Sequence, residues 1–183
     1  MLNKTIIAIL GLPGSGKTET IDYLMEKYGW PKVYFGDVTF DEIRRRGLPV
    51  NEQNERTVRE GLRAEFGRLH YADQVIKKIE SLENNVILVE SLYDWVEYKR
   101  FKEKFGDRFK NIAIYASPEI RYKRLETRKI RPLTRAEAQG RDYAQIENLS
   151  QAGPIAMADH TVINNADFDE LYLQIDKIIK NLT

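Results

Sequence analysis

Short apolar runs alternate along the chain with longer stretches in which apolar residues recur at helical spacing. The first run, residues 6–10, is rich in β-branched side chains and has no polar alternation, which is typical of a strand buried on both faces. The predicted strands are residues 6–10, 32–35, 86–89, 112–116 and 161–163. Because these runs alternate with helical patterns, they predict an α/β fold with a five-stranded, mostly parallel sheet flanked by helices.

The stretches between the runs show the periodicity of amphipathic helices. In residues 18–28 the apolar positions recur at i, i+3, i+4 and i+7 from Ile21, and Gly29 is placed to end the helix. The other predicted helices are residues 39–47, 51–66, 69–82, 94–105, 117–128, 134–149 and 167–182. No internal repeat and no long linker interrupts this pattern, so residues 1–183 are predicted to form a single domain.

Four of the predicted helices carry a recognisable start signal. Three have an N-cap residue followed three positions later by glutamate, which predicts a capping box or a related cap. These pairs are Thr39 with Glu42, Thr134 with Glu137, and Asp167 with Glu170. The fourth signal is Ser117 followed by Pro118, an N-cap with proline at the first helical position.

The sharpest feature is a glycine-rich loop between the first strand and the first helix. Residues 11–18 read Gly-Leu-Pro-Gly-Ser-Gly-Lys-Thr and match G-x-x-x-x-G-K-[ST] in full. The glycines let the backbone curl so that successive N–H groups point at phosphate oxygens. Lys17 is expected to reach the β- and γ-phosphates, and the Thr18 hydroxyl to bind Mg²⁺. The predicted ATP-binding residues are Gly11, Gly14, Ser15, Gly16, Lys17 and Thr18.

Composition narrows the possible functions without naming one. The 183 residues are 42% hydrophobic and 31% charged, which excludes a disordered chain, and the net charge of +1 argues against a broad nucleic-acid surface. The chain has no cysteine, so disulfides and thiolate metal sites are excluded. No apolar stretch approaches the roughly 20 residues of a membrane span, and a cytoplasmic location is expected. The chain also lacks the N-K-x-D signature of guanine recognition, which disfavours a GTPase.

A local basic stretch stands out against this balance. Residues 121–135 contain seven basic residues and one acid. Arg124 and Arg128 are four positions apart on a predicted helix, so they share a face and are expected to neutralise charge on a transferring phosphoryl group. Arg141, on the next helix, is a further candidate phosphate ligand. For a second set we expect a solvated basic face instead, namely Arg121, Lys123 and Lys129.

Two acids lie at the ends of predicted strands. Asp37 follows the second strand and could orient an acceptor, accept the proton of an attacking hydroxyl, or cap the following helix. Glu90 closes the third strand, where a carboxylate could hold Mg²⁺ through water or serve solubility alone. These alternatives stay open for each residue.

The order of these motifs resembles the nucleoside monophosphate kinases and dephospho-CoA kinases of the P-loop superfamily, and most closely a subgroup of small adenylate-kinase-related proteins. Besides the loop, the resemblance rests on Gly36-Asp37, Arg124-Leu125-Glu126-Thr127-Arg128, the stretch 133–145, and Ala158-Asp159 through Asn164-Asn165. It implies a P-loop kinase with ATP and Mg²⁺, a helical acceptor-binding region at residues 37–83 and a short lid at residues 128–134. The implied function is transfer of the γ-phosphoryl group of ATP to a nucleotide-like acceptor.

The chain also departs from these families. Adenylate kinases usually carry an arginine where this chain has Phe40, and dephospho-CoA kinases usually have a second acid where it has Phe35. Two alternatives therefore stay open: a dephospho-CoA kinase that phosphorylates a ribose hydroxyl, and a non-catalytic ATP-binding switch. The sequence does not predict the oligomeric state.

Overall fold

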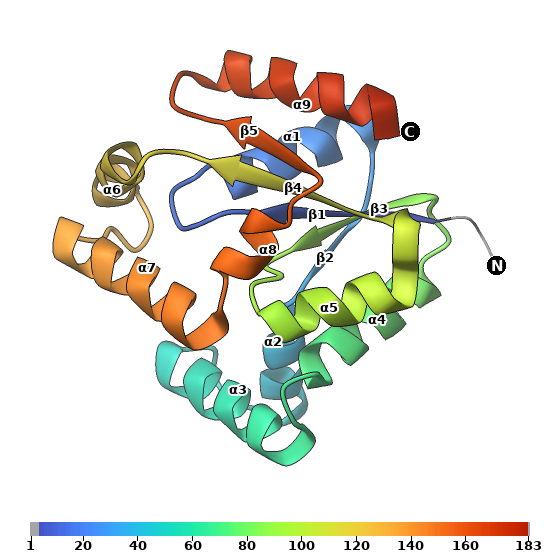
Figure 1. The fold of residues 1–183 in the computed structure, drawn as a ribbon. Coiled ribbons are helices and arrows are strands. Elements are labelled where there is room, and N and C mark those ends of the chain that lie inside the picture. Colours follow the sequence, from blue (N-terminus) through green and yellow to red (C-terminus); the bar gives the residue numbers. More distant parts are fainter. Residues whose placement is uncertain (1–3, 183) are drawn as a thin grey trace.

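A single sheet of five strands forms the centre of the molecule (Figure 1). The structure is a computed structural model and describes residues 4–182. The strands are β1 (Thr5–Leu10), β2 (Lys32–Tyr34), β3 (Val86–Glu90), β4 (Phe109–Tyr115) and β5 (His160–Ile163). They pair in the order β2-β3-β1-β4-β5, and every pair is parallel. The predicted α/β class and five-stranded sheet are confirmed.

Helices cover both faces of this sheet. They are α1 (Lys17–Tyr28), α2 (Asp37–Arg45), α3 (Glu52–Phe66), α4 (His70–Ser81), α5 (Trp95–Phe105), α6 (Pro118–Thr127), α7 (Arg135–Leu149), α8 (Ala152–Ala156) and α9 (Phe168–Leu182), with a short 3-10 turn at Gly106–Arg108. Ile7 and Ile9 of β1 pack on one face with α1 and α9, whereas Ile6 and Ala8 pack on the other with α4 and α5. Strict alternation along a strand sends neighbouring side chains into different layers.

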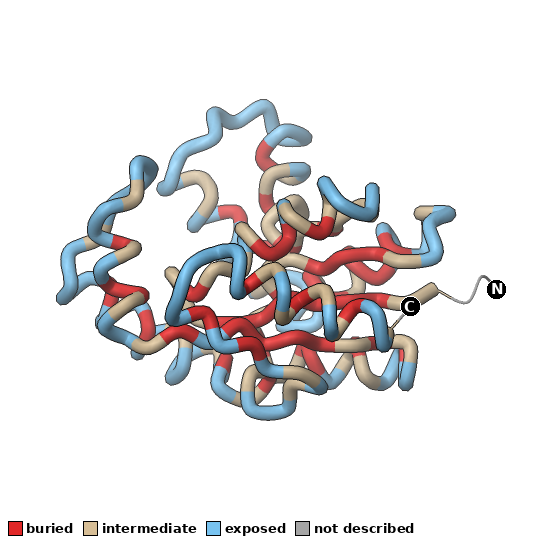
Figure 2. The backbone as a smooth tube through the Cα atoms, turned by 90° about the horizontal axis from the view of Figure 1, so that it is seen from above, coloured by how far each residue is buried: buried red, intermediate tan, exposed pale blue. Residues whose placement is uncertain are grey.

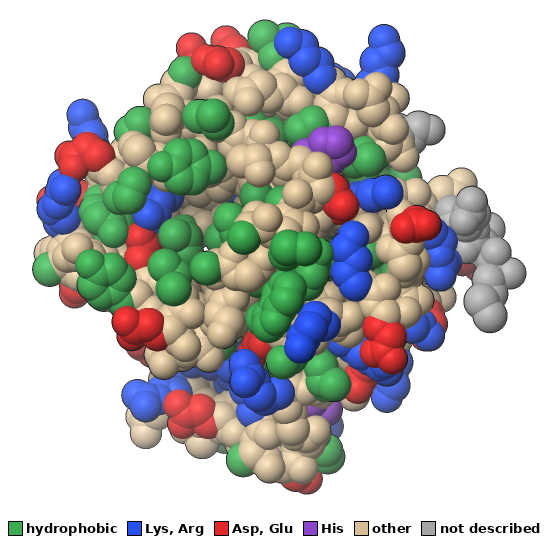
Figure 3. Space-filling view, in the orientation of Figure 1, with side chains coloured by type: hydrophobic (Ala, Val, Ile, Leu, Met, Phe, Trp, Pro, Cys, Tyr) green, Lys and Arg blue, Asp and Glu red, His purple; other side chains and the backbone are tan. Residues whose placement is uncertain are grey.

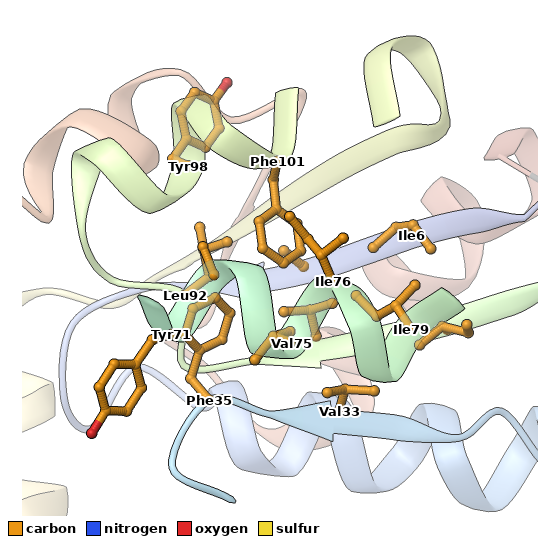
Figure 4. Close-up of a cluster of buried hydrophobic side chains, with 14 of the residues drawn as sticks. Ile6, Val33, Phe35, Tyr71, Val75, Ile76, Ile79, Leu92, Tyr98 and Phe101 are labelled. Atoms are coloured by element: carbon orange, nitrogen blue, oxygen red, sulfur yellow. The ribbon is translucent and has the colours of Figure 1, made fainter. Parts of the chain in front are cut away.

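The central strands β1, β3 and β4 consist mostly of buried residues (Figure 2). In the layer beneath the sheet, Phe101 of α5 points toward Ile76 of α4 and is fully buried (Figure 4). Its ring lies 5.4 Å from that of Phe109 on β4, between centroids. Because both faces of the sheet are covered, the buried middle of β1, β3 and β4 is mostly apolar, which is why the apolar runs located these strands. Strand β4 begins at Phe109, before the predicted residue 112, because Lys110 and Asn111 interrupt its apolar run.

Most predicted helix starts are confirmed, and one is wrong. Thr134 forms a capping box with Glu137, and the Ser117 and Asp167 side chains accept from backbone N–H groups three residues on. Thr39, however, lies inside α2, which already begins at Asp37. The Thr39 side chain is buried and its hydroxyl is 2.7 Å from that of Tyr71, so it serves a tertiary contact instead of a cap. The five-residue helix α8 was not predicted, because five residues are too few to show helical periodicity.

The topology determines where a ligand can bind. Strand β1 lies between β3 and β4. The chain runs from β1 to β2 on one side of it, and the connection from β3 to β4 crosses to the other side. Open α/β sheets bind ligands in the crevice at the carboxyl ends of such strands. The glycine-rich loop follows β1 at this edge, and Figure 1 shows α6 and α7 at the end of the sheet to which the β4 arrow points.

Charged side chains of both signs are interspersed over the face shown in Figure 3. Several arginines there and elsewhere are held in local ion pairs, for example Arg45 and Arg46 with Glu42 of α2. Within residues 4–182, no helix has the length and apolar character needed to cross a membrane.

Candidate nucleotide-binding site

The loop after β1 adopts backbone conformations that require glycine. Gly11, Gly14 and Gly16 have φ angles of 140°, 79° and 106°, a region that side chains rarely adopt. A Cβ on Gly11 would lie 2.4 Å from the Ile114 carbonyl oxygen, and one on Gly14 would lie 2.8 Å from the Arg121 carbonyl oxygen. The glycines therefore permit both the curl of the loop and its close contact with β4 and α6.

Three side chains from distant segments hold the carbonyl groups of this loop. Arg121 of α6 donates to the Pro13 oxygen at 3.0 Å, and Gln151 donates to the Gly11 oxygen at 3.0 Å. The Asn164 amide, just after β5, donates to the Ser15 oxygen at 2.8 Å. These three contacts hold the backbone of the loop in one path, and loops of this type offer backbone N–H groups to an anion.

A pocket of about 240 Å³ opens at this loop, and cations line it. Its lining residues are Gly14, Gly16, Lys17, Thr18, Glu19, Arg124, Leu125, Arg128 and Phe168. Among the described residues, none of Lys17, Arg124 and Arg128 has a carboxylate within ion-pair distance. Arg124 instead donates to the Asn164 side-chain oxygen and the Ala166 carbonyl, both at 3.3 Å. The structure thus brings the loop together with Arg124 and Arg128. The prediction that both arginines share a helical face is wrong, because α6 ends at Thr127 and Arg128 has an extended backbone.

Two buried polar atoms near this pocket have no hydrogen-bond partner. They are Oγ of Ser15 and Nη1 of Arg124. Buried polar groups are nearly always paired in folded proteins, and an orphaned donor beside unpaired cations fits a site built for an anion. The donor set and the charges therefore fit the phosphate chain of a nucleotide.

Burial and neighbouring charge lower the pKa of Lys17 to about 8. Burial is the largest cause, and the positive charge of Arg141 on α7 is the next, whereas Glu90 acts in the opposite direction. The Lys17 ammonium donates to the Leu12 carbonyl at 3.0 Å. The pKa of Arg128 is lowered as well, by burial and by Arg141. Arg141 therefore lies close enough to add to the positive field of the loop.

Arg121 corrects a prediction. We expected a solvated basic face, but Arg121 is only 4% exposed and forms a two-pronged ion pair with Asp142 of α7, at 2.9 and 2.6 Å. Tyr122 donates to the same carboxylate at 2.9 Å. Lys123 and Lys129 are exposed, as expected. Asp142 and Gln151 gave no local signal in the sequence, because their partners are distant in the chain.

The two strand-end acids take different positions. Glu90 ends β3, next to β1, and its carboxylate forms an ion pair with Lys32 at 2.8 Å. Asp37 is the first residue of α2 and pairs with Lys78 of α4 at 2.9 Å. Asp37 lines a second cavity of about 690 Å³ between α2 and α4. This cavity and the pocket at the loop share none of the lining residues in the described part of the chain.

Two tyrosines connect the surroundings of this cavity with the loop. Tyr34 lines the cavity, and burial together with the neighbouring Tyr93 and Glu90 raises its pKa. The ring of Tyr93 in turn lies 5.9 Å from the Lys17 ammonium, measured to the ring centroid. Tyr93 follows Ser91, whose φ of 69° is unusual for a residue other than glycine.

Comparisons with known proteins agree with this geometry. A family model described as an AAA domain matches residues 7–148. A UPF0200 protein of Pyrococcus furiosus is 32% identical over 179 residues, which cover 95% of each chain. The chain belongs to the AAA domain family and to the UPF0200 proteins. A UPF0200/UPF0201 protein of Archaeoglobus fulgidus is 33% identical over 194 residues, and this UPF0200 chain spans 57% of its length.

Solved structures share the fold at low sequence identity. TT1252 from Thermus thermophilus has a TM-score of 0.67 at 18% identity, with 99% of both chains covered. A gluconokinase from Sinorhizobium meliloti has a TM-score of 0.60 at 16% identity, covering 99% of this chain and 96% of the gluconokinase. A shikimate kinase from Bacteroides thetaiotaomicron also has 0.60 at 16%, covering 97% and 98%. The UPF0200 chain therefore has the fold of P-loop small-molecule kinases. Its resemblance to nucleoside monophosphate and dephospho-CoA kinases stays a prediction.

Replacing Lys17 by methionine is expected to stabilise the ligand-free protein. Because folding lowers the pKa of Lys17 from 10.5 to about 8, the charged lysine destabilises the folded state below pH 8. This penalty disappears as the pH rises through 10.5. Urea unfolding should show Lys17→Met more stable by up to about 3 kcal/mol at pH 7, and by little at pH 10.5. Lys123→Met, at an exposed site, should stay within about 0.5 kcal/mol. Equal stability of wild type and Lys17→Met at pH 7 would contradict the burial of this charge.

Replacing Asp142 by asparagine is expected to destabilise the fold strongly. The substitution leaves the Arg121 guanidinium buried without its carboxylate, which typically costs about 3–5 kcal/mol. Urea unfolding measures the loss. Glu119→Gln is the matched control, because it removes an exposed ion pair with Arg135 and should cost less than about 1 kcal/mol. Similar losses in the two variants would show that the buried pair does not hold α7 to the loop.

Proposed function

We propose that this UPF0200 protein is an ATP-dependent phosphotransferase that moves the γ-phosphoryl group to a small, nucleotide-like acceptor. The observation that supports this most directly is the meeting of a phosphate-binding loop with unpaired Lys17, Arg124 and Arg128 in one pocket. Phosphoryl transfer needs little covalent chemistry from a protein, and it depends on positioning and on neutralising charge around phosphorus. These residues can do both.

We propose that different parts of the pocket bind the phosphates and the base of ATP. The loop N–H groups, Lys17 and Arg128 would hold the phosphates. Phe168 and the planar Arg124 guanidinium line the rest of the pocket and offer flat faces for a base. Arg141 of α7 would add its positive charge near Lys17. Arg131 of the lid lies 3.8 Å from Glu55 of α3, measured between Nη2 and Oε1, so the lid already reaches the proposed acceptor region.

Magnesium fits the site only together with phosphate. The part of the chain that the structure describes contains no group of three or more acidic or histidine side chains able to hold a metal. Mg²⁺ favours a few protein ligands with water and phosphate oxygens, so Thr18 and, through water, Glu90 would complete its shell. When bound, the ion would supply positive charge against the phosphate oxygens.

The proposed transfer forms one bond and breaks one. The acceptor oxygen bonds to the γ-phosphorus, and the bond to the β,γ-bridging oxygen breaks, so ADP leaves with that electron pair. A phosphate acceptor is already ionised, whereas a hydroxyl must lose a proton. Asp37 would take that proton or orient the acceptor. Because its cavity and the loop pocket share no lining residue, residues 37–83 would have to move toward the loop, as in other enzymes that close around substrates.

Loss of the phosphate-binding cations is expected to reduce ATP turnover far more than stability. ADP release should be measured with nucleoside monophosphates and dephospho-CoA as acceptors. Lys17→Met and Arg128→Ala should each lower the stimulated rate by about 100-fold or more, because each removes charge from the transition state. Lys129→Ala, exposed in the same lid, should retain most activity. Unchanged turnover in both site variants would refute the assignment. Tight ATP binding without stimulation by any acceptor would favour the switch.

Replacing Asp37 by asparagine separates the two kinase alternatives. If the acceptor is a ribose hydroxyl, as for dephospho-CoA, the variant loses its proton acceptor and should be inactive. If the acceptor is a monophosphate, part of the activity should remain, because no proton has to be removed. The measurement is the initial rate with each acceptor at saturating ATP. Lys78→Met is the control, because it removes the ion-pair partner of Asp37 and keeps the carboxylate. Full activity of Asp37→Asn with every acceptor would exclude both roles.

A further inference from the structure

One acid lies among the cations of the loop pocket. Glu19, in the first turn of α1, lines the same 240 Å³ space as Lys17, Arg124 and Arg128. A carboxylate can only accept hydrogen bonds, and it repels phosphate. A ligand that contacts this carboxylate must therefore offer a donor, and the phosphate chain offers none.

The tertiary structure holds this carboxylate in place. The Tyr172 hydroxyl of α9 donates to Oε1 of Glu19, and this hydrogen bond raises the pKa of Tyr172 to about 12. The Tyr172 ring stacks on Tyr23 of α1, with centroids 4.1 Å apart. No hydrogen bond to the second oxygen, Oε2, is found among the described residues, so it is available to a ligand.

The same side of α9 also provides the flat end of the pocket. Phe168 precedes Tyr172 by one helical turn, and their ring centroids lie 6.3 Å apart. Phe168 is 46% exposed and lines the pocket. Glu19 directly follows Thr18 of the phosphate-binding loop. Its carboxylate accepts from Tyr172, which lies one helical turn from Phe168. Its carboxylate therefore connects the phosphate end of the pocket with the aromatic end.

In a nucleoside triphosphate, the ribose lies between the phosphates and the base. We infer that Glu19 accepts a hydrogen bond from the ribose 2′-hydroxyl, so that the pocket selects ribonucleotides over 2′-deoxyribonucleotides. This inference rests on the proposed function, because it needs the triphosphate in the loop. The 2′-hydroxyl can donate to the free carboxylate oxygen, and the 2′-deoxy analogue lacks this donor. The flat faces of Phe168 and Arg124, by contrast, can stack on any base.

Isothermal titration of the full chain with ATP, 2′-deoxy-ATP, GTP and inorganic tripolyphosphate tests the inference. Wild type should bind ATP about tenfold or more tightly than 2′-deoxy-ATP, as expected for a hydrogen bond to a charged group. Glu19→Ala should bring this ratio close to one and leave tripolyphosphate binding equal or tighter, because a negative charge is removed. Glu26→Ala, an exposed acid on the same helix, should keep the wild-type ratio. Tyr172→Phe should reduce the ratio partly, because the carboxylate loses its anchor.

The other outcomes overturn the inference in distinguishable ways. An unchanged ratio of ATP affinity to 2′-deoxy-ATP affinity in Glu19→Ala would show that Glu19 does not bind the ribose 2′-hydroxyl. A change confined to the ratio of ATP to GTP would assign the carboxylate to the base instead. Equal weakening of all four ligands would make Glu19 a structural tie between α1 and α9. If wild type bound none of the four, the proposed function would fail together with the inference.

Discussion

The phosphate-binding loop keeps its shape because side chains from three later segments hold its carbonyl oxygens. Arg121, Gln151 and Asn164 reach it from α6, from the start of α8 and from the end of β5. An unpaired carbonyl buried at these positions would cost about 1–3 kcal/mol, so each donor also favours one path of the backbone. The loop can offer its N–H groups to a ligand only while these contacts hold it. Binding therefore depends on the packing of the last third of the chain.

The contact of Arg121 with the loop also positions α7, the helix that contains Arg141. Asp142 holds Arg121 from α7, and its neighbour Arg141 adds to the positive charge near Lys17. One buried ion pair thus joins the loop, α6 and α7 into a unit. Buried pairs add little net stability over apolar packing, but they specify a geometry, which is what a phosphate site requires.

The cations of the loop pocket differ from the surface arginines in whether an acid is close to them. The surface arginines of α2 are paired with acids on their own helix, whereas the cations of the loop pocket have no acid within ion-pair distance in the described residues. The cost appears in the lowered pKa of Lys17. A ligand with several negative charges would offset both the burial of this ammonium and its repulsion by Arg141, so the stability lost without ligand would contribute to the affinity for it. The net charge of +1 conceals this local arrangement.

Features that depend on residues close together in the chain could be predicted from the sequence, whereas features that depend on contacts between distant residues could not. Apolar runs, glycines at positive φ and the Thr134 capping box depend on neighbours within a few residues, so the strands, the loop and that helix start were predictable. Arg121 looked like part of a basic surface because its partner is 21 residues away, and Thr39 looked like a cap because Tyr71 is 32 residues away. The chain by itself determined that a phosphate-binding loop would follow a buried strand. Only the tertiary structure decided which charges remain unpaired around it, because packing chooses the partners.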